Sequence, residues 1–270
     1  MEVVVQEEHS STGMGDLPES CIASILRLTT PRNVARLAGV SRVFRDASHS
    51  DSVWQTMLPP FYEDILAQAA DAPARSCSRK EIYEFLTTPV LLENGTQDFW
   101  LDRATGGVCR SMGARGLYMV WGEDPRYWSW IQQEGSRFAE VAYLTQVWWL
   151  QVEGNMHCSL LPGTYTVSWR LSFAHDDVNG FDDPPVKFSV EGPDHVLINV
   201  YKDLANHWSS NFGDSKWAEL DVGEFTVGRG VSPVAIKFSL KEIDCGYLKS
   251  GMFVDSVLIQ PTAVKKISID

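Results

Sequence analysis

The chain has 270 residues, of which 44% are hydrophobic and 21% are charged, and its formal net charge is −12. This length allows one large domain and a small one, and the composition is that of an ordinary globular protein. Acidic residues outnumber basic ones both before and after residue 98. Neither part has the positive field that nucleic acids require, and no apolar run approaches a membrane helix, so we expect neither nucleic-acid nor membrane partners.

The N-terminal residues and the cysteines indicate the subcellular compartment of the protein. Residues 1–11 (MEVVVQEEHSS) lack the basic region and the long apolar core of a signal peptide. The five cysteines are widely spaced and form no CxxC pair, so they indicate neither a zinc site nor a disulfide framework. Reduced thiols are typical of intracellular proteins. We therefore expect this chain in the cytoplasm or the nucleus.

Residues 17–59 are predicted to form several short helices. Pro18 stands at a favoured first-turn position, and apolar residues then recur at helical spacing. Thr30 before Pro31, and Ser41 before the next apolar stretch, are N-cap signals for two further helices. About forty residues are too few for a self-sufficient core. The segment therefore either folds onto the rest of the chain or completes its packing against a partner.

The same segment carries an ordered set of motif residues. It reads LPxxxIxxIL, then a proline-led helix with LAxVSRxFR, and then SDxxWxxxLP. This order resembles an F-box, over residues 14–60. In that family the helices bind the Skp-type adaptor of SCF ubiquitin ligases, and through it the cullin. Phe44 and Trp54 would hold the helices together. The resemblance assigns the adaptor contacts to Leu17, Pro18, Ile22, Ile25, Leu26 and Val34.

Residues 61–97 are helix-prone but less clearly patterned. Apolar residues predict one helix around residues 62–69. Ser78 followed by Glu81 is a capping-box signal for a second helix. We expect this segment to be a helical connector between two domains, without chemistry of its own.

From Phe99 onward the pattern changes to short alternating strands. Residues 164–173 (TYTVSWRLSF) place aromatic and aliphatic side chains on one face and polar ones on the other. Eight or so strands separated by Gly, Pro and Asp turns predict an antiparallel, jelly-roll-like β-sandwich over residues 98–265. The fold class is therefore multi-domain α + β. The other expected strands are 117–121, 146–153, 186–191, 195–201, 217–225, 236–241 and 252–259.

Residues 120–131 (VWGEDPRYWSWI) gather large aromatic side chains around one turn. An exposed tryptophan can stack on the C–H face of a sugar ring while neighbouring acids accept hydrogen bonds from its hydroxyls. Alternatively, the tryptophans plug the open end of the sandwich, since large aromatic residues are buried on average. The residues by themselves leave both interpretations open.

The wider sequence carries further motifs in order, including FWLDRATGGVC, VWWLQVEG and KEIDCGYLKSGMFVDSVLIQP. Together they resemble the phloem protein two (Nictaba-like) lectin domain. Sugar-binding members of that family recognise N-acetylglucosamine oligomers and N-glycan cores. The resemblance assigns the carbohydrate or cargo site to Trp121, Trp128 and Glu242. A second acid of the binding members falls at Ala235, which cannot accept a hydroxyl hydrogen bond.

The two resemblances imply a non-catalytic substrate receptor of a plant SCF-type ubiquitin ligase. Its F-box would hold the adaptor, and its sandwich would hold protein cargo, such as glycoproteins bearing N-acetylglucosamine-containing glycans. The alternative is a stand-alone defence lectin that uses the helices as a folding cap. No catalytic motif is present, and the acidic loop 176–185 lacks EF-hand spacing. We expect no enzymatic activity, cofactor or metal.

Overall fold

The computed structural model describes residues 17–74, 76–174, 178–181, 183–204, 217–230 and 233–267. Contacts divide the chain into two compact units. The helical unit comprises the described residues up to Pro59 together with Pro73–Phe85 and Arg103–Gly106. The sandwich unit comprises Pro60–Ala72, Leu86–Asp102 and the described residues from Gly107 onward. The sequence predicted three segments, with bounds 14–60, 61–97 and 98–265. These bounds remain predictions.

In the helical unit, Pro18 is the N-cap residue of the first helix rather than part of its first turn, whereas the second and third helices begin where the sequence predicts. The Thr30 hydroxyl accepts a hydrogen bond from the Asn33 N–H, and the Ser41 hydroxyl accepts one from the Phe44 N–H. Both predicted caps are therefore confirmed, and each satisfies a backbone donor that the first helical turn leaves unpaired. The helices of this unit are α1 (Glu19–Leu26), α2 (Pro31–Leu37), α3 (Arg42–Ser48), α4 (Asp51–Gln55) and α6 (Arg79–Leu86).

Helix α6 completes the core of this unit, although it follows α4 by more than twenty residues in sequence. The Trp54 ring of α4 lies 5.0 Å from the Tyr83 ring of α6, and its Nε1–H donates to the Ser48 carbonyl at 2.7 Å. Asp51 accepts a hydrogen bond from the Arg79 N–H at 2.8 Å, at the start of α6. The predicted capping box is confirmed as well, because the Glu81 carboxylate accepts from the Ser78 N–H.

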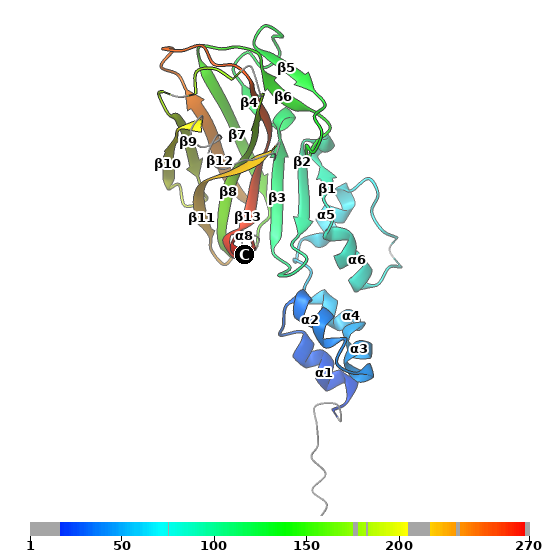
Figure 1. Cartoon of the computed structure of the whole chain (residues 1–270). Coiled ribbons are helices and arrows are strands. Elements are labelled where there is room, and N and C mark those ends of the chain that lie inside the picture. The colour runs from blue at the N-terminus through cyan, green and yellow to red at the C-terminus, as the bar shows by residue number, and fades with distance from the viewer. Residues whose placement is uncertain are drawn as a thin grey trace, which may run out of the picture. The chain divides into compact units, whose positions relative to one another are not determined.

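The sandwich unit contains two antiparallel sheets, whose strands run side by side in Figure 1. The eight-stranded sheet has the order β1-β2-β3-β13-β6-β5, and β8 pairs with both β13 and β11. The five-stranded sheet has the order β10-β9-β12-β7-β4. The predicted multi-domain α + β class with an antiparallel sandwich is therefore confirmed.

The sandwich unit contains the strands of these two sheets and two helices. The strands are β1 (Val90–Leu92), β2 (Gln97–Leu101), β3 (Val108–Gly113), β4 (Tyr118–Met119), β5 (Trp128–Ile131), β6 (Val141–Leu144), β7 (Leu150–Cys158), β8 (Gly163–Phe173), β9 (Val186–Glu191), β10 (Leu197–Lys202), β11 (Ala218–Val227), β12 (Val234–Glu242) and β13 (Met252–Pro261). The helices are α5 (Tyr62–Gln68) and α8 (Thr262–Ile267), and short 3₁₀ turns cover Glu93–Gly95 and Ala114–Gly116.

Trp169 on β8 is the centre of the sandwich core. It is fully buried, and its ring makes edge contacts with Phe188 of β9 at 6.0 Å and Phe238 of β12 at 6.1 Å. These partners lie on the opposite sheet, so the contacts join the two layers. The alternation over residues 164–173 correctly identified this inward-facing side of β8.

Strand β3 has no counterpart among the predicted strands because it is buried along its whole length. A strand covered on both faces shows no apolar–polar alternation. Some of its polar groups have specific partners: the Ser111 hydroxyl donates to the buried Asp98 carboxylate at 2.5 Å. Arg110 donates to the Gln97 side chain at 3.0 Å. Period-two analysis therefore misses this strand for a physical reason.

We expect the cysteines to differ sharply in alkylation by iodoacetamide. All five are free thiols; Cys21 and Cys245 are exposed, whereas Cys109 and Cys158 are buried. Burial raises the pKa of the Cys158 thiol to about 11, and it also raises the pKa of Cys109, so neither forms a reactive thiolate at pH ~8. Peptide mass spectrometry should find the exposed pair labelled in the native chain. Labelling of the buried pair before denaturation would contradict this packing.

Candidate functional site

The candidate site lies at the end of the sandwich where β7 begins and β12 ends. Leu150, the first residue of β7, pairs with Glu242, the last residue of β12. On the other side of β7, the Val120 N–H donates to the Gln151 carbonyl, so Trp121 follows directly beside the start of β7. Loop 147–149 is joined to Lys249 by reciprocal backbone hydrogen bonds. The aromatic turn and the C-terminal motif are thereby brought to one loop end.

Trp121 is the exposed tryptophan of the VWGEDPRYW motif. Its side chain is 49% exposed, and its ring lies 5.0 Å from that of Tyr127. Its φ is +57°, a left-handed conformation that bulky residues rarely adopt. The strand predicted over residues 117–121 accordingly ends at Met119, because the chain turns away from the sheet at Trp121. Such strain costs roughly 1–3 kcal/mol and persists only where the surroundings enforce it.

Trp128 and Trp130 hold the backbone on either side of Trp121. The Trp128 Nε1–H donates to the Val120 carbonyl at 3.2 Å, and the Trp130 Nε1–H donates to the Gly122 carbonyl at 3.1 Å. Trp128 is only 2% exposed. In this arrangement Trp128 supports the backbone before Trp121, and its role as a sugar contact stays a prediction. Of the two residues, Trp128 is buried as a plug would be, whereas Trp121 is left at the surface.

The turn between Trp121 and Trp128 carries a fixed carboxylate. Arg126 donates to both carboxylate oxygens of Asp124 through its side chain, at distances of 2.6 to 3.1 Å. These hydrogen bonds hold the pKa of Asp124 below its usual value, so the group stays ionised. The Arg126 guanidinium also lies 5.4 Å from the Tyr127 ring. The turn thus presents an aromatic pair next to an oriented acceptor.

Glu242 is buried rather than open to a ligand. Its carboxylate accepts a hydrogen bond from the Asp244 N–H at 2.8 Å and forms an ion pair with the fully buried Lys249. Lys249 donates in turn to the Trp148 carbonyl at 2.7 Å. In this geometry Glu242 anchors the loop that carries Trp148. A role as direct sugar ligand stays a prediction and requires this ion pair to open.

We expect Glu242→Gln to destabilise the sandwich unit by about 3–5 kcal/mol, because it leaves the buried Lys249 charge uncompensated. Adding Lys249→Met should recover much of that loss. Denaturant unfolding followed by tryptophan fluorescence measures both, since nine of the ten tryptophans lie after residue 98. A Glu242→Gln chain as stable as the original would show that the pair is not structural.

Ala235 does not belong to this loop end. It lies seven residues before Glu242 on β12, which corresponds to roughly 23 Å along the strand, and it pairs with His157. The effect of this alanine on sugar binding stays a prediction.

Sequence reasoning missed several exposed apolar residues at the same end of the sandwich. Trp148 is 53% exposed and Tyr247 is 55% exposed, and Trp149 and Ile243 are also at the surface. The Trp149 Nε1–H donates to the Gln151 side chain at 2.8 Å, which fixes its ring. A strand over residues 146–153, as predicted, would place one of the two adjacent tryptophans on each face. The two residues instead precede β7 in a bend, and both are exposed. We call Trp121, Trp148, Trp149, Ile243 and Tyr247 the aromatic rim.

The six residues predicted to contact an adaptor fall into two groups. Leu17, Pro18 and Ile25 are at least partly exposed. Ile22, Leu26 and Val34 are buried in the helical unit itself, where they support the helices that carry the first group. Two further apolar side chains are strongly exposed, Leu28 at 89% and Val40 at 68%, and neither was predicted as a contact. Leu17, Pro18, Ile25, Leu28 and Val40 form what we call the apolar helical surface.

Metal-ligand clusters and membrane-spanning helices are absent from the part of the chain that the structure describes. It contains no group of three His, Cys, Asp or Glu side chains arranged to hold a metal ion. Asp176, Asp177 and Asp182 of the acidic loop lie outside the described residues. Within the described ranges, no helix combines the length and apolarity needed to cross a bilayer.

Comparison with known proteins matches both units. The phloem protein 2 family model matches residues 107–261, and an F-box-like family model matches residues 14–59. F-box protein PP2-A15 of Arabidopsis thaliana is 38% identical over 92% of this chain and 88% of its own length. F-box protein PP2-A11 of the same plant is 35% identical over 94% and 90%. A family 35 carbohydrate-binding module from Paenibacillus barcinonensis aligns with 55% of this chain and 96% of its own, at 12% identity and a TM-score of 0.33.

Proposed function

This chain belongs to the F-box proteins that carry a phloem protein 2 domain, and from that membership we propose that it is the substrate-recognition subunit of an SCF-type ubiquitin ligase. The helical unit binds a Skp-type adaptor, and through it the cullin. The sandwich unit binds the cargo. The chain acts without catalytic groups of its own, in the cytoplasm or the nucleus, by raising the local concentration of cargo lysines near a ubiquitin-charged enzyme.

The apolar helical surface carries this proposal. Leu17, Leu28 and Val40 are all exposed on a unit of only a few short helices. An exposed leucine by itself needs no explanation, but several on one small unit favour burial against a partner. The unit's own core is already filled by Ile22, Leu26 and Trp54. A folding cap would need no such surplus of apolar residues outside its core.

For the cargo we propose glycoproteins that expose an N-glycan core or N-acetylglucosamine oligomers, bound at the aromatic rim. The half-exposed Trp121 ring offers a flat apolar face on which the C–H face of a sugar ring can stack. Asp124 supplies an ionised acceptor on the same turn. Trp149, held by Gln151, extends the apolar surface along the start of β7. Chitotriose, the N-acetylglucosamine trimer, is therefore the expected minimal ligand.

Two measurements on the full chain test the proposal. Affinity capture with a purified Skp-type adaptor should recover a stoichiometric complex, and a glycan array should give signal on N-acetylglucosamine oligomers. Glycan binding without adaptor capture would favour the stand-alone lectin. Adaptor capture without any glycan signal would leave a ligase receptor whose rim binds protein. Failure of both would remove the proposal.

A further inference from the structure

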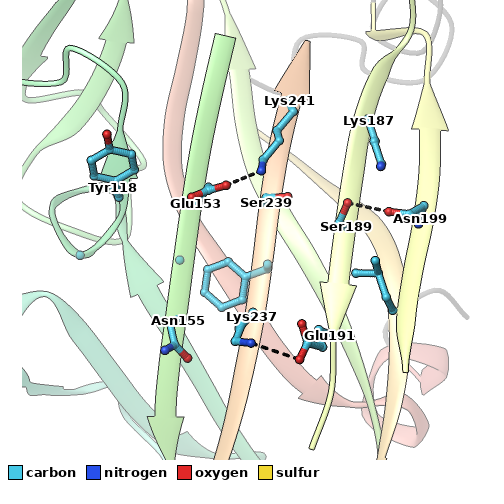
Figure 2. A pocket seen from close by; sticks show the side chains of 14 residues that line it. Tyr118, Glu153, Asn155, Lys187, Ser189, Glu191, Asn199, Lys237, Ser239 and Lys241 are labelled. Carbon is cyan, nitrogen blue, oxygen red and sulfur yellow. Dashed lines mark hydrogen bonds and ion pairs between the residues drawn. The ribbon is translucent and has the colours of Figure 1, made fainter. Parts of the chain in front are cut away.

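The outer face of the five-stranded sheet forms an open groove that is separate from the aromatic rim. Figure 2 shows its lining side chains, which rise from β7, β12, β9 and β10, with Tyr118 of β4 at one side. The groove has a volume of about 640 Å³. Its floor is made of small residues, Gly154, Ser239 and Ser189, and longer polar side chains stand around them. This depression follows directly from the residue sizes along the strands.

The strand register sets two lysines directly against each other in this groove. Lys241 of β12 pairs with Lys187 of β9, so both side chains leave the same face from neighbouring positions. Like charges directly opposite one another destabilise a sheet. Lys241 is neutralised by an ion pair with Glu153, whereas the described residues provide no ion-pair partner for Lys187. In a chain with a net charge of −12 this is a local excess of positive charge.

Hydroxyl, amide and carboxylate groups lie next to the two lysines. In the next row of the sheet Ser239 pairs with Ser189, and Ser189 pairs with Asn199. The Ser189 hydroxyl donates to the Asn199 side-chain oxygen at 2.8 Å, which leaves the amide N–H groups directed to other acceptors. One row further, Lys237 forms an ion pair with Glu191 at 3.1 Å. The groove therefore combines one uncompensated cation with several neutral donors and acceptors.

We propose that this groove is a second ligand site, which takes an acidic saccharide. A carboxylate of the ligand lies between Lys187 and Lys241 and reduces the charge repulsion between them. Its hydroxyls bond to Asn199 and to the carboxylates of Glu153 and Glu191, and a ring packs on Tyr118, which is exposed at the side of the groove. This inference uses no residue of the aromatic rim and does not depend on the proposed ligase role.

The carboxylates in the groove favour a saccharide over an acidic peptide as the ligand. Glu153 and Glu191 are both ionised, because hydrogen bonds from Lys241 and from His195 and Lys237 lower their pKa values. A polyanion such as an Asp/Glu-rich peptide would meet this negative charge along the groove and be repelled. A saccharide with isolated carboxylates places hydroxyl donors there instead. The mixed lining thus matches a ligand that is acidic at one position and neutral at others.

Isothermal titration of the full chain with galacturonosyl-galactobiose, a trimer with a single carboxylate, and with neutral galactotriose as the matched ligand, tests the proposal. The acidic trimer should bind at least roughly tenfold more tightly than the neutral one, and Lys187→Gln should remove that advantage. Lys187 is the residue to change because replacing Lys241 would leave Glu153 without its cation. Lys187→Arg should retain binding. Lys202→Gln, the same charge change on β10 outside the groove lining, is the control.

Equal affinity for the two trimers in the original chain would overturn the proposal, as would acidic binding that survives Lys187→Gln. Stronger binding of a poly-Asp peptide than of the acidic trimer would overturn the choice of a saccharide. Trp121→Ala should leave binding of the acidic trimer unchanged, and Lys187→Gln should leave chitotriose binding unchanged. A failure at this groove is therefore distinguishable from a failure at the aromatic rim.

Discussion

Replacing Leu17 and Pro18 together with alanine is expected to weaken capture of a Skp-type adaptor at least about thirtyfold while the chain stays folded. Removal of two apolar contacts from the centre of an interface costs about 2 kcal/mol or more, which corresponds to this factor. Both residues precede the first turn of α1 and are exposed, so their truncation opens no cavity. Surface plasmon resonance with immobilised adaptor gives the affinity, and thermal melting reports the fold.

Two controls separate contact from folding in that experiment. Ile22→Ala removes a fully buried side chain, so it should destabilise the helical unit by about 2–5 kcal/mol and lose adaptor through unfolding. Leu91→Ala changes a comparably exposed leucine of the sandwich unit and should affect neither property. Unchanged capture by the Leu17 and Pro18 variant would falsify the adaptor role of this surface.

Trp121→Ala and Trp128→Ala should both abolish binding of chitotriose, but for different reasons. The Trp121 ring is half exposed, so its loss removes the sugar platform and should change the free energy of unfolding by less than about 1 kcal/mol. The positive φ at this position is equally unfavourable for alanine, so the change in stability comes from the lost contact with Tyr127. Trp128 is buried and bonds the Val120 carbonyl, so its truncation should cost about 3–5 kcal/mol.

The measurement combines a glycan array with denaturant unfolding of each variant. Trp128→Phe provides the refined case, because it keeps most of the buried ring but removes the Nε1–H donor to Val120. Its stability should fall by only about 1–3 kcal/mol, and its sugar affinity should still drop since the turn around Trp121 loses a support. Full glycan binding by Trp128→Ala would show that the indole does not position Trp121.

Local signals in the sequence were sufficient for the short helices and for several strands. The caps at Thr30, Ser41 and Ser78 are found as predicted, because an N-cap depends only on residues three positions apart. Strand β8 was recognised because apolar and polar residues alternate along it, with Trp169 facing the core. Strand β3 was missed because its sequence, VCRSMG, has no such alternation. The contact between Trp54 and Tyr83 joins segments far apart in sequence, so no local signal could reveal it.

For the candidate sites, too, the sequence and the tertiary structure each determined a different part. The sequence by itself determined that this chain is an F-box protein with a phloem protein 2 domain, because motif order and spacing are carried by the chain. Only the tertiary structure decided which motif residues face outward. Exposure depends on strand register and loop packing, which bury Trp128 and Glu242 and leave Trp121, Trp148 and Tyr247 at the surface. The opposition of Lys187 and Lys241 likewise exists only through the pairing of β9 with β12.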